Sequence, residues 1–367
     1  MIKKAMSDEY NAYHAINSRK EKYGVYFKTC FHVHTPESYD YTLLSDWNKN
    51  NYFDSTDKEI FDICINRRVF TSLSKIDDFE PIGQFSEFSS RKEVMSFLLL
   101  AEELIVKEIE VVVVADHNTI MGVTKLKKAI SILCSLKRRR TYPEVILGIE
   151  ISCADKKHVV GIFDDTIDNT LSINKWLKNN LLNDEEGSYE TSMRVLQYIN
   201  SIGGIGYIAH IDTSETFDAN YLSSAYRHKL YSDEISNFVG LSDFGRLIYI
   251  KSKLTKYRSE EIKFFIDNDA HDLESIDKKF FWIKGRKRNF SMIKEAIYDY
   301  DVSISFTEQK YNRQYIKGIF IEKSKDGFLK GNDGKGAFCL NFSDALNCII
   351  GGVVPARVVY LKYWSMF

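Results

Sequence analysis

Histidine and acidic residues in this sequence gather where short apolar runs end. The clearest group is His32 and His34 in the run CFHVHTPESYD, which ends at Asp40. In an extended strand, residues two apart point to the same side, so His32 and His34 are predicted to form a metal-chelating pair. A lone histidine is more often a core or surface residue, but two in phase favour a ligand pair, to which Asp40 adds an oxygen donor.

A second group consists of Asp116 and His117, which come directly after four valines at 111–114. The valines are typical of a buried strand, and burying an acid or an imidazole without a partner costs several kcal/mol. The placement therefore indicates a partner such as a metal ion. For Asp116, a loop or helix cap is the alternative interpretation.

Three further groups follow the same pattern. Glu150 lies in the apolar run GIEIS, and His158 opens the next apolar run. His210 ends the run GGIGYIAH, whose glycine spacing matches neither a P-loop nor a dinucleotide fingerprint. Asp269 and His271 again stand two apart. Each group thus adds an imidazole or a carboxylate at the end or the start of a predicted strand.

The distribution of histidines points to one shared site. The chain has eight histidines, and only His14 and His228 lie outside these five groups. Random placement would not put the others at strand ends so consistently, so a cluster of several metal ions is the economical explanation.

Strand-like runs alternate along the chain with segments whose apolar residues recur every three or four positions, which predicts an α/β barrel or a doubly wound sheet. The polar residues at strand ends favour the barrel, because the carboxyl ends of parallel strands converge on one face. Residues 36–90 hold no comparable unit and predict an elaborated loop over the site. The predicted strands are 26–33, 110–115, 145–151, 158–163, 205–209, 238–241 and 302–306, and the predicted helices are 90–107, 121–136, 192–201, 259–268 and 291–300.

The motifs HVHT with Asp40, ADHNT, GIEIS with His158, AH at 209–210 and DAH at 269–271, in this order, resemble the polymerase-and-histidinol-phosphatase (PHP) family over roughly residues 25–305. The resemblance implies a distorted (β/α)7 barrel with two or three Mn, Zn or Fe ions. One ion would take His32, His34, Glu150 and Asp269. Glu150 would bridge to a second ion held by His158 and His210, and Asp40, His117 and His271 would hold the third. All nine ligand positions are filled in this sequence.

The same resemblance implies a phosphoester hydrolase in which a hydroxide bridging two cations attacks phosphorus in line. Asp116 would orient ligands or take up a proton. The side chains expected to take part in catalysis are Asp116, His117, Glu150 and His271.

The sequence also resembles a PHP subgroup fused to an SMC-like or AAA-type ATPase, through FWIK at 281–284 and LNCIIGG at 346–352. In that subgroup the second segment leads into a Walker A loop, whereas this chain continues with VVPARVVY. We hypothesise that the tail is a frame-shifted or truncated ATPase start. The expected domains are an N-terminal extension (1–24), the PHP domain (25–311) and this β-rich start of an ATPase-like domain (312–367).

Composition constrains the partners. Lys and Arg number 50 against 51 Asp and Glu, so nucleic acid would have to bind local basic clusters, at 137–140 and 284–288, rather than a global field. Such runs are most often solvated surface. Six cysteines without a CxxC pair, and no long apolar stretch, predict a cytoplasmic protein without a membrane span.

These observations favour a nuclease or other phosphodiesterase acting on nucleic acid, with a separate ATPase as partner and a role in defence against foreign DNA. Two alternatives stay open at this point: a phosphomonoesterase acting on a small metabolite, and a regulatory module whose metal ions are structural.

Overall fold

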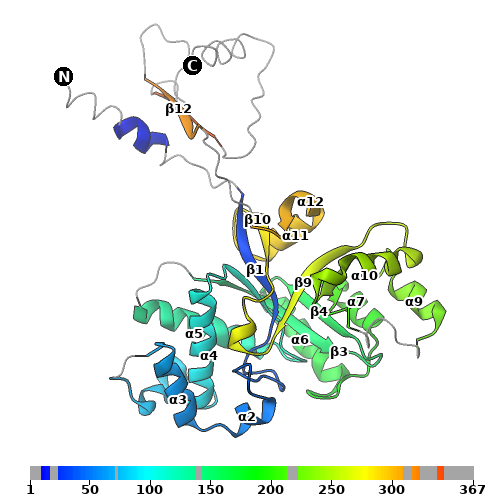
Figure 1. The fold of residues 1–367 in the computed structure, drawn as a ribbon, viewed down its shortest axis with the longest axis horizontal. Helices are drawn as coiled ribbons and strands as arrows, with labels where there is room; N and C mark the ends of the chain where they lie inside the picture. Colours follow the sequence, from blue (N-terminus) through cyan, green and yellow to red (C-terminus); the bar gives the residue numbers. More distant parts are fainter. Residues whose placement is uncertain are drawn as a thin grey trace. The chain divides into compact units, whose positions relative to one another are not determined.

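Seven strands close into a barrel at the centre of the chain (Figure 1). They pair in the order β1-β2-β3-β4-β7-β8-β9, and β9 pairs back with β1. All neighbours are parallel except that β4 runs antiparallel to both β3 and β7. The predicted distorted (β/α)7 barrel is therefore confirmed. The barrel strands are β1 (Val25–Val33), β2 (Val111–Val114), β3 (Glu144–Ser152), β4 (His158–Phe163), β7 (Ile205–Ile208), β8 (Phe238–Leu241) and β9 (Lys263–Ala270).

The computed structural model describes residues 10–16, 24–70, 73–137, 142–213, 222–308, 316–322 and 337–342. The chain divides into two compact units, Val25–Glu308 and a second one formed by Met1–Gly24 with Gln309–Phe367. In the second unit, β12 (Gly318–Ile321) and β13 (Phe338–Asn341) form an antiparallel pair. The LNCIIGG segment and the VVPARVVY segment that follows it lie outside the described residues.

Helices surround the barrel in Figure 1. The α-helices are α2 (Lys49–Asp54), α3 (Asp57–Asn66), α4 (Arg91–Val106), α5 (Met121–Lys137), α6 (Ile167–Asn180), α7 (Ser192–Ser201), α9 (Ser224–Leu230), α10 (Leu247–Leu254), α11 (Phe290–Tyr298) and α12 (Tyr300–Ser303). Short 3-10 helices are η1 (Ile76–Phe79), η2 (Gly83–Phe85), η3 (Phe244–Arg246), η4 (Thr255–Tyr257) and η5 (Leu273–Ser275). The remaining strands of this unit are β5 (Leu181–Asn183), β6 (Gly187–Ser188), β10 (Phe281–Gly285) and β11 (Ile304–Ser305).

Two apolar layers hold the barrel. The interior is filled by side chains such as Phe31, Val113, Tyr207 and Phe265, and a larger cluster packs the strands against the surrounding helices. The four buried valines of β2 alternate between these two layers. This strand is therefore apolar on both faces. The barrel is therefore a packed core, and polar groups are available only where strands end.

The prediction of a helix at 259–268 is wrong, because Lys263–Ala270 is the barrel strand β9. Phe264 and Phe265 are both buried there, one in each apolar layer. A strand covered on both faces loses the simple alternation of apolar and polar residues, and its apolar run cannot be told from a helix by period alone.

The segment 36–90 is more ordered than the predicted loop, since it holds α2, α3, η1 and η2. Asn48 and Thr56 cap α2 and α3 with side-chain oxygens, and both helices have a capping box. Aromatic residues such as Phe79, Phe85 and Phe88 fix the segment on α4. The insertion is thus a helical layer beside the site.

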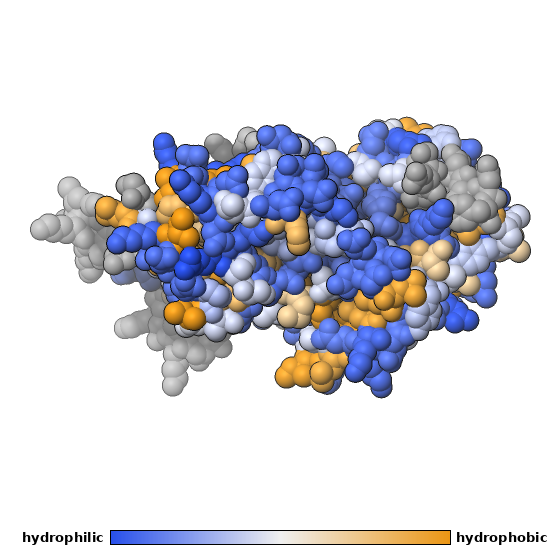
Figure 2. Space-filling view, turned by 90° about the horizontal axis from the view of Figure 1, so that it is seen from below, coloured by the Kyte–Doolittle hydropathy of each residue, from blue (hydrophilic) through white to orange (hydrophobic). Residues whose placement is uncertain are grey.

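One face of the molecule is mainly polar, with apolar residues in separate patches (Figure 2). Among the described residues, no helix combines the length and the apolar character that crossing a bilayer requires.

Candidate metal centre

The nine predicted ligands come together at the carboxyl end of the barrel strands, and we refer to them as the histidine–carboxylate cluster. Donor atoms within each of three sets lie no more than 4.8 Å apart. The sets are His32, His34, Glu150 and Asp269; His34, Asp40, His117 and His271; and His117, Glu150 and His158. The first set is the one that the PHP resemblance implies for one ion, and the second contains the three residues implied for another.

His32 and His34 face the same site through a break in β1 rather than by simple alternation. Phe31 packs inside the barrel, whereas Val33, two residues on, packs in the outer layer. The register of β1 shifts between Cys30 and Val33 against β2 and between Phe31 and Val33 against β9, and His32 has a φ of 64°. As a result both imidazoles face the cluster, with ring centroids 4.9 Å apart.

Left-handed backbone recurs in the cluster. His32, His210 and Asp269 have φ values of 64°, 31° and 54°. Each such residue costs of order 1–3 kcal/mol and persists only where surrounding structure enforces it. These bends turn side chains inward just where the strands end, and strain of this kind is typical of functional sites.

Three buried side-chain atoms that make no hydrogen bond within the described residues indicate that the cluster fits metal ions. His32 Nε2, His34 Nε2 and Glu150 Oε2 are buried, and within the described part of the chain they make no hydrogen bond. They nevertheless crowd together, with His32 Nε2 only 2.9 Å and His34 Nε2 3.4 Å from Glu150 Oε2. Imidazole nitrogens and carboxylate oxygens are the usual ligands of Zn and of related divalent ions. A cation among these three atoms would satisfy all of them.

Glu150 occupies the middle of the cluster. Its Oε2 lies 3.2 Å from His117 Nδ1, and its Oε1 lies 2.9 Å from His158 Nδ1 and 3.3 Å from His210 Nε2. Burial raises the pKa of Glu150, but the charges of His117, His32 and His158 outweigh it and hold that pKa well below the ordinary value. An ionised carboxylate with both oxygens among imidazoles has the geometry of a bridging ligand.

Backbone hydrogen bonds just after the ends of β2 and β7 position the histidines around Glu150. His117 forms an isolated bridge with Glu150, supported by the hydrogen bond from Asn118 N to Glu150 O at 2.7 Å. Ala209 N donates to His158 O at 2.9 Å, which brings His158 beside His210. His210 contacts Glu150 but lies outside the compact third set, where His117 stands instead.

Asp40 and His271 form the outer part of the cluster. Asp40 Oδ2 lies 3.0 Å from His271 Nε2 and 3.2 Å from His117 Nε2. The loop after Asp40 is held by Thr42, whose N–H donates to His271 O at 3.0 Å. Burial lowers the pKa of His271, but the hydrogen bond and charge of Asp40 and the charge of Asp269 outweigh it and raise that pKa to about 9.

Burial decreases from one side of the cluster to the other. The side chains of His32, His34 and Glu150 are 0% exposed, whereas Asp269 is 33% and His158 31% exposed. The exposed side, which we call the mouth of the barrel, is therefore the side from which a substrate can approach.

Ser38 fixes His34, a role that the sequence alone did not indicate. Ser38 Oγ lies 3.0 Å from His34 Nδ1 and donates to Asp40 Oδ1 at 2.8 Å. With Nδ1–H directed at Ser38, the Nε2 lone pair of His34 faces the cluster. Burial lowers the pKa of His34 to about 3, so this imidazole is neutral and available as a ligand.

Asp267 is a second residue of the site whose role the sequence alone did not indicate. It is fully buried, and its Oδ1 lies 2.6 Å from His32 Nδ1. Its Oδ2 accepts the N–H of His210 at 2.6 Å, and Tyr207 Oη donates to Oδ1 at 3.2 Å. A carboxylate on the far nitrogen of a histidine fixes the ring and raises its basicity. The signal was present at the end of β9, where Asp267 and Asp269 lie in the strand and His271 directly follows it, each two residues apart.

Asp116 contacts Thr35 rather than the donors of the cluster. Its Oδ1 accepts the N–H of Thr35 at 2.5 Å, and its Oδ2 accepts the Thr35 hydroxyl at 2.9 Å. Burial raises the pKa of Asp116 to about 7. Because both oxygens hold the residue after His34, these contacts favour the orienting role over the proton-accepting one.

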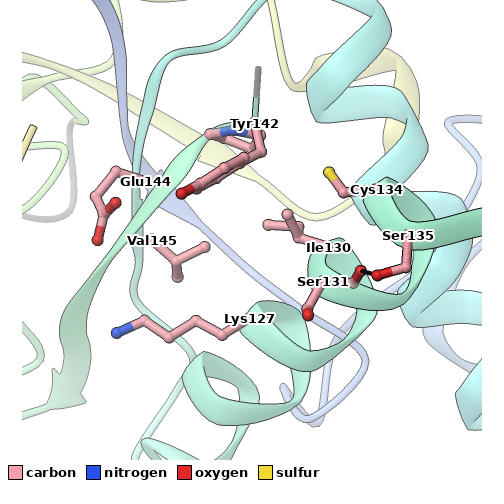
Figure 3. A pocket seen from close by; sticks show the side chains of 9 residues that line it. Lys127, Ile130, Ser131, Cys134, Ser135, Tyr142, Glu144 and Val145 are labelled. Atoms are coloured by element: carbon pink, nitrogen blue, oxygen red, sulfur yellow. Dashed lines mark hydrogen bonds between the residues drawn. The ribbon is translucent and has the colours of Figure 1, made fainter. Parts of the chain in front are cut away.

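A separate hollow of about 480 Å³ lies between α5 and the start of β3 (Figure 3). Its lining includes Lys127, Cys134, Tyr142 and Glu144, and none of these belongs to the cluster. The hollow lies where β3 begins, whereas the cluster lies where the strands end.

The basic segment 284–288 also lies away from the cluster. Lys284 is in register with Tyr26, six residues before His32, which corresponds to about 20 Å of extended strand. Arg288 donates to Tyr142 O at 2.8 Å, just before β3, and Lys137 ends α5 on the same side. The described members of the two basic clusters therefore do not flank the metal centre.

No protein-family model matches the sequence. An uncharacterized protein of Streptococcus pneumoniae serotype 4 (strain TIGR4) is 38% identical over 237 residues, which cover 63% of this chain and 89% of the relative. This chain belongs to the family of that streptococcal protein.

Among solved structures, the lesion-specific endonuclease EndoQ of Pyrococcus furiosus aligns with a TM-score of 0.45 at 15% identity, over 74% of this chain and 56% of that chain. The chain thus spans little more than half the length of that endonuclease. A Bacteroides vulgatus two-domain protein containing a predicted PHP-like metal-dependent phosphoesterase aligns with a TM-score of 0.42 at 8% identity, over 87% and 84% of the two chains. Both scores lie below 0.5, so the chemistry of this chain has to be inferred from its own side chains.

Proposed function

We propose that this protein is a metal-dependent phosphoester hydrolase, and that its substrate is a phosphodiester of nucleic acid. The observation that carries the proposal is the convergence of His32 Nε2, His34 Nε2 and Glu150 Oε2, all buried and without a hydrogen bond in the described residues. Imidazole nitrogens and a carboxylate oxygen buried at one point are the ligand set of a divalent cation.

The first set of the cluster would hold one ion, with Glu150 shared by a second ion beside His158 and His210. His34, Asp40, His117 and His271 would hold a third. When bound, such ions lower the pKa of coordinated water and neutralise charge on phosphoryl oxygens.

The protein's own groups orient the ligands. Asp267 fixes His32, Ser38 fixes His34 and Asp40, and Asp116 holds Thr35 at the end of β1. The buried side chains keep one side of the cluster dry, while the exposed ones leave the mouth open to substrate.

An open mouth supports a diester over a small monoester, because a polymer must enter and leave past the reacting phosphate. The ligand side chains Asp40 and His271 are 26% and 22% exposed, so the site is not closed over a small molecule. The nucleic-acid substrate, an ATPase partner and a role in defence stay predictions from the sequence.

The test compares hydrolysis of bis-p-nitrophenyl phosphate, p-nitrophenyl phosphate and single- and double-stranded oligonucleotides by the Mn-loaded protein. We expect the diesters to be cleaved, and His32→Ala and Asp269→Ala to lose at least 100-fold in rate, on the order of the loss seen when a catalytic group is removed. His228→Ala is the matched control, because this histidine contacts Tyr257 outside the cluster.

Preference for the monoester would reject the nucleic-acid assignment. Full metal occupancy without turnover of any substrate would reject the hydrolase and favour the regulatory module.

A further inference from the structure

We propose that Tyr39 and Lys49 form a nucleotide-binding subsite at the mouth of the barrel, which stacks a base and binds a phosphate of single-stranded nucleic acid. In the free protein Glu185 occupies the phosphate position of this subsite. The inference rests on the proposed function and names the part of the substrate that lies beyond the reacting phosphate.

Tyr39 lies at the edge of the cluster. It directly precedes Asp40, and its ring centroid is 5.2 Å from that of His117, at an interplanar angle of 41°. The side chain is half-buried, so part of the ring is open to solvent. A partly open aromatic ring beside the cluster is a surface on which a base can stack.

Lys49 lies next to this ring. Its Nζ is 5.3 Å from the Tyr39 centroid, and its side chain is 46% exposed. It is the first residue of α2, whose start is fixed by the capping box of Asn48 and Asn51. From the two ring distances, Lys49 Nζ lies at most about 10.5 Å from the centroid of the His117 ring. This separation is short enough for Lys49 to bind a phosphate of a neighbouring nucleotide in the same strand.

Glu185 approaches Lys49 from the turn between β5 and β6. Glu185 Oε1 is 3.8 Å from Lys49 Nζ. The turn is held in place by Asn118, the residue after His117, whose Nδ2 donates to Asp184 O at 2.8 Å. Asn183 Oδ1 accepts the N–H of Glu185 at 3.0 Å. The carboxylate is thus presented from a fixed turn to Lys49.

The Lys49–Glu185 pair is suited to exchange. Glu185 is 68% exposed, and exposed ion pairs contribute little to stability. A phosphate can therefore replace the carboxylate on Lys49 at small cost. Paired in this way, Lys49 is held over the Tyr39 ring while no substrate is bound.

The ring and the ammonium together favour nucleic acid over a small phosphoester. A small monoester offers the cluster its one phosphate and has no second phosphate for Lys49. A nucleic-acid strand carries both a base for the ring and a further phosphate for the lysine. Stacking on a side chain requires an unstacked base, which single strands offer. The proposal therefore names single-stranded nucleic acid.

The experiment uses the full, Mn-loaded chain with two substrates, bis-p-nitrophenyl phosphate and a fluorescein-labelled oligothymidylate. Tyr39→Ala and Lys49→Ala are each expected to raise the KM for the oligonucleotide about tenfold more than the KM for the small diester. Tyr39→Phe keeps the ring and should retain the wild-type KM. Glu185→Gln should lower the KM for the oligonucleotide, because it removes the competing charge.

Salt dependence distinguishes phosphate binding by Lys49 from a purely structural role of this residue. In Lys49→Ala the slope of log affinity against log salt should decrease by roughly one. Lys128→Ala is the matched control, since Lys128 is a partly exposed lysine on α5 that pairs with Glu87. It should leave both KM values and the slope unchanged.

The subsite is rejected if the two alanine variants change the KM for both substrates equally, or change the KM for neither. If the wild-type protein cleaves nothing, the proposed function fails on its own. Fluorescence anisotropy of the labelled oligonucleotide then still tests the subsite, which requires a tenfold weaker affinity in both variants and is rejected by equal affinities.

Discussion

Replacing Asp267 with Asn should weaken metal binding without removing any of the nine predicted ligands. Asp267 Oδ1 lies 2.6 Å from His32 Nδ1, and its Oδ2 accepts the N–H of His210 at 2.6 Å. An asparagine has one oxygen and one NH₂ group, so it cannot accept from both donors. One N–H of the protein would then face an N–H of the amide in a fully buried site.

The expected magnitude follows from the lost charge and the lost orientation. Removing the carboxylate behind a metal-binding histidine typically costs 10–100-fold in metal affinity, or about 1.4–2.8 kcal/mol. The unsatisfied donor lowers the free energy of unfolding of the metal-free protein by about 1–3 kcal/mol. Burial opposes protonation of His32, but the charges of Asp267 and Glu150 raise its pKa well above the usual value. The variant should therefore also lower that pKa.

The assay is competition for Mn²⁺ or Zn²⁺ against a chromophoric chelator, with urea unfolding of the metal-free protein in parallel. Asp212→Asn is the matched control, because Asp212 is equally buried and accepts the N–H groups of Ser242 and Asp243 through its two oxygens. It should lose stability but keep its metal affinity. Equal metal affinities of Asp267→Asn and wild type would refute the role assigned to Asp267.

Three further predictions concern stability and pH. Lys125→Ala removes the buried cation between the carboxylates of Glu37 and Glu93 and should lower the free energy of unfolding by about 3–5 kcal/mol. Because burial raises the pKa of Glu37 to about 7, this loss should be smaller at pH 5 than at pH 8 in urea unfolding, and a pH-independent loss would contradict it. Gly122→Ala would place a Cβ 2.0 Å from Asp116 Oδ2, so a loss of about 2–3 kcal/mol is expected by the same method, while no loss would show that the site can relax. The pKa of His271, raised to about 9, means that it carries a proton at pH 7 in the metal-free protein and must lose it to bind a cation. Mn²⁺ affinity should therefore rise from pH 7 to pH 9 with measurable proton release, and a flat profile would contradict this.

The sequence alone was sufficient to predict which groups converge. A histidine or an acid at the end of an apolar strand has few ways to be satisfied, and a closed barrel brings the ends of its strands to one face. The residues His34, Glu150, His210 and His271, far apart in sequence, therefore meet as expected. What those groups bind stays a prediction.

The sequence did not reveal how they are oriented. Alternation alone suggested a regular strand at His32–His34, whereas the structure reaches the same result through a break at His32 with a φ of 64°. Asp267 and Ser38 escaped notice because a buried acid or a loop serine has many ordinary explanations until its partner is known. The helix predicted over β9 failed for a related reason, since a strand buried on both faces has no distinctive period.

The metal centre is tested most directly by an anomalous-scattering map from crystals of the Mn-loaded protein, collected on both sides of the Mn absorption edge. We expect at least two peaks at the carboxyl end of the barrel strands. One peak should lie about 2.0–2.3 Å from His32 Nε2, His34 Nε2 and a Glu150 oxygen. A map without a peak among these three atoms, from protein shown to contain Mn, would contradict it.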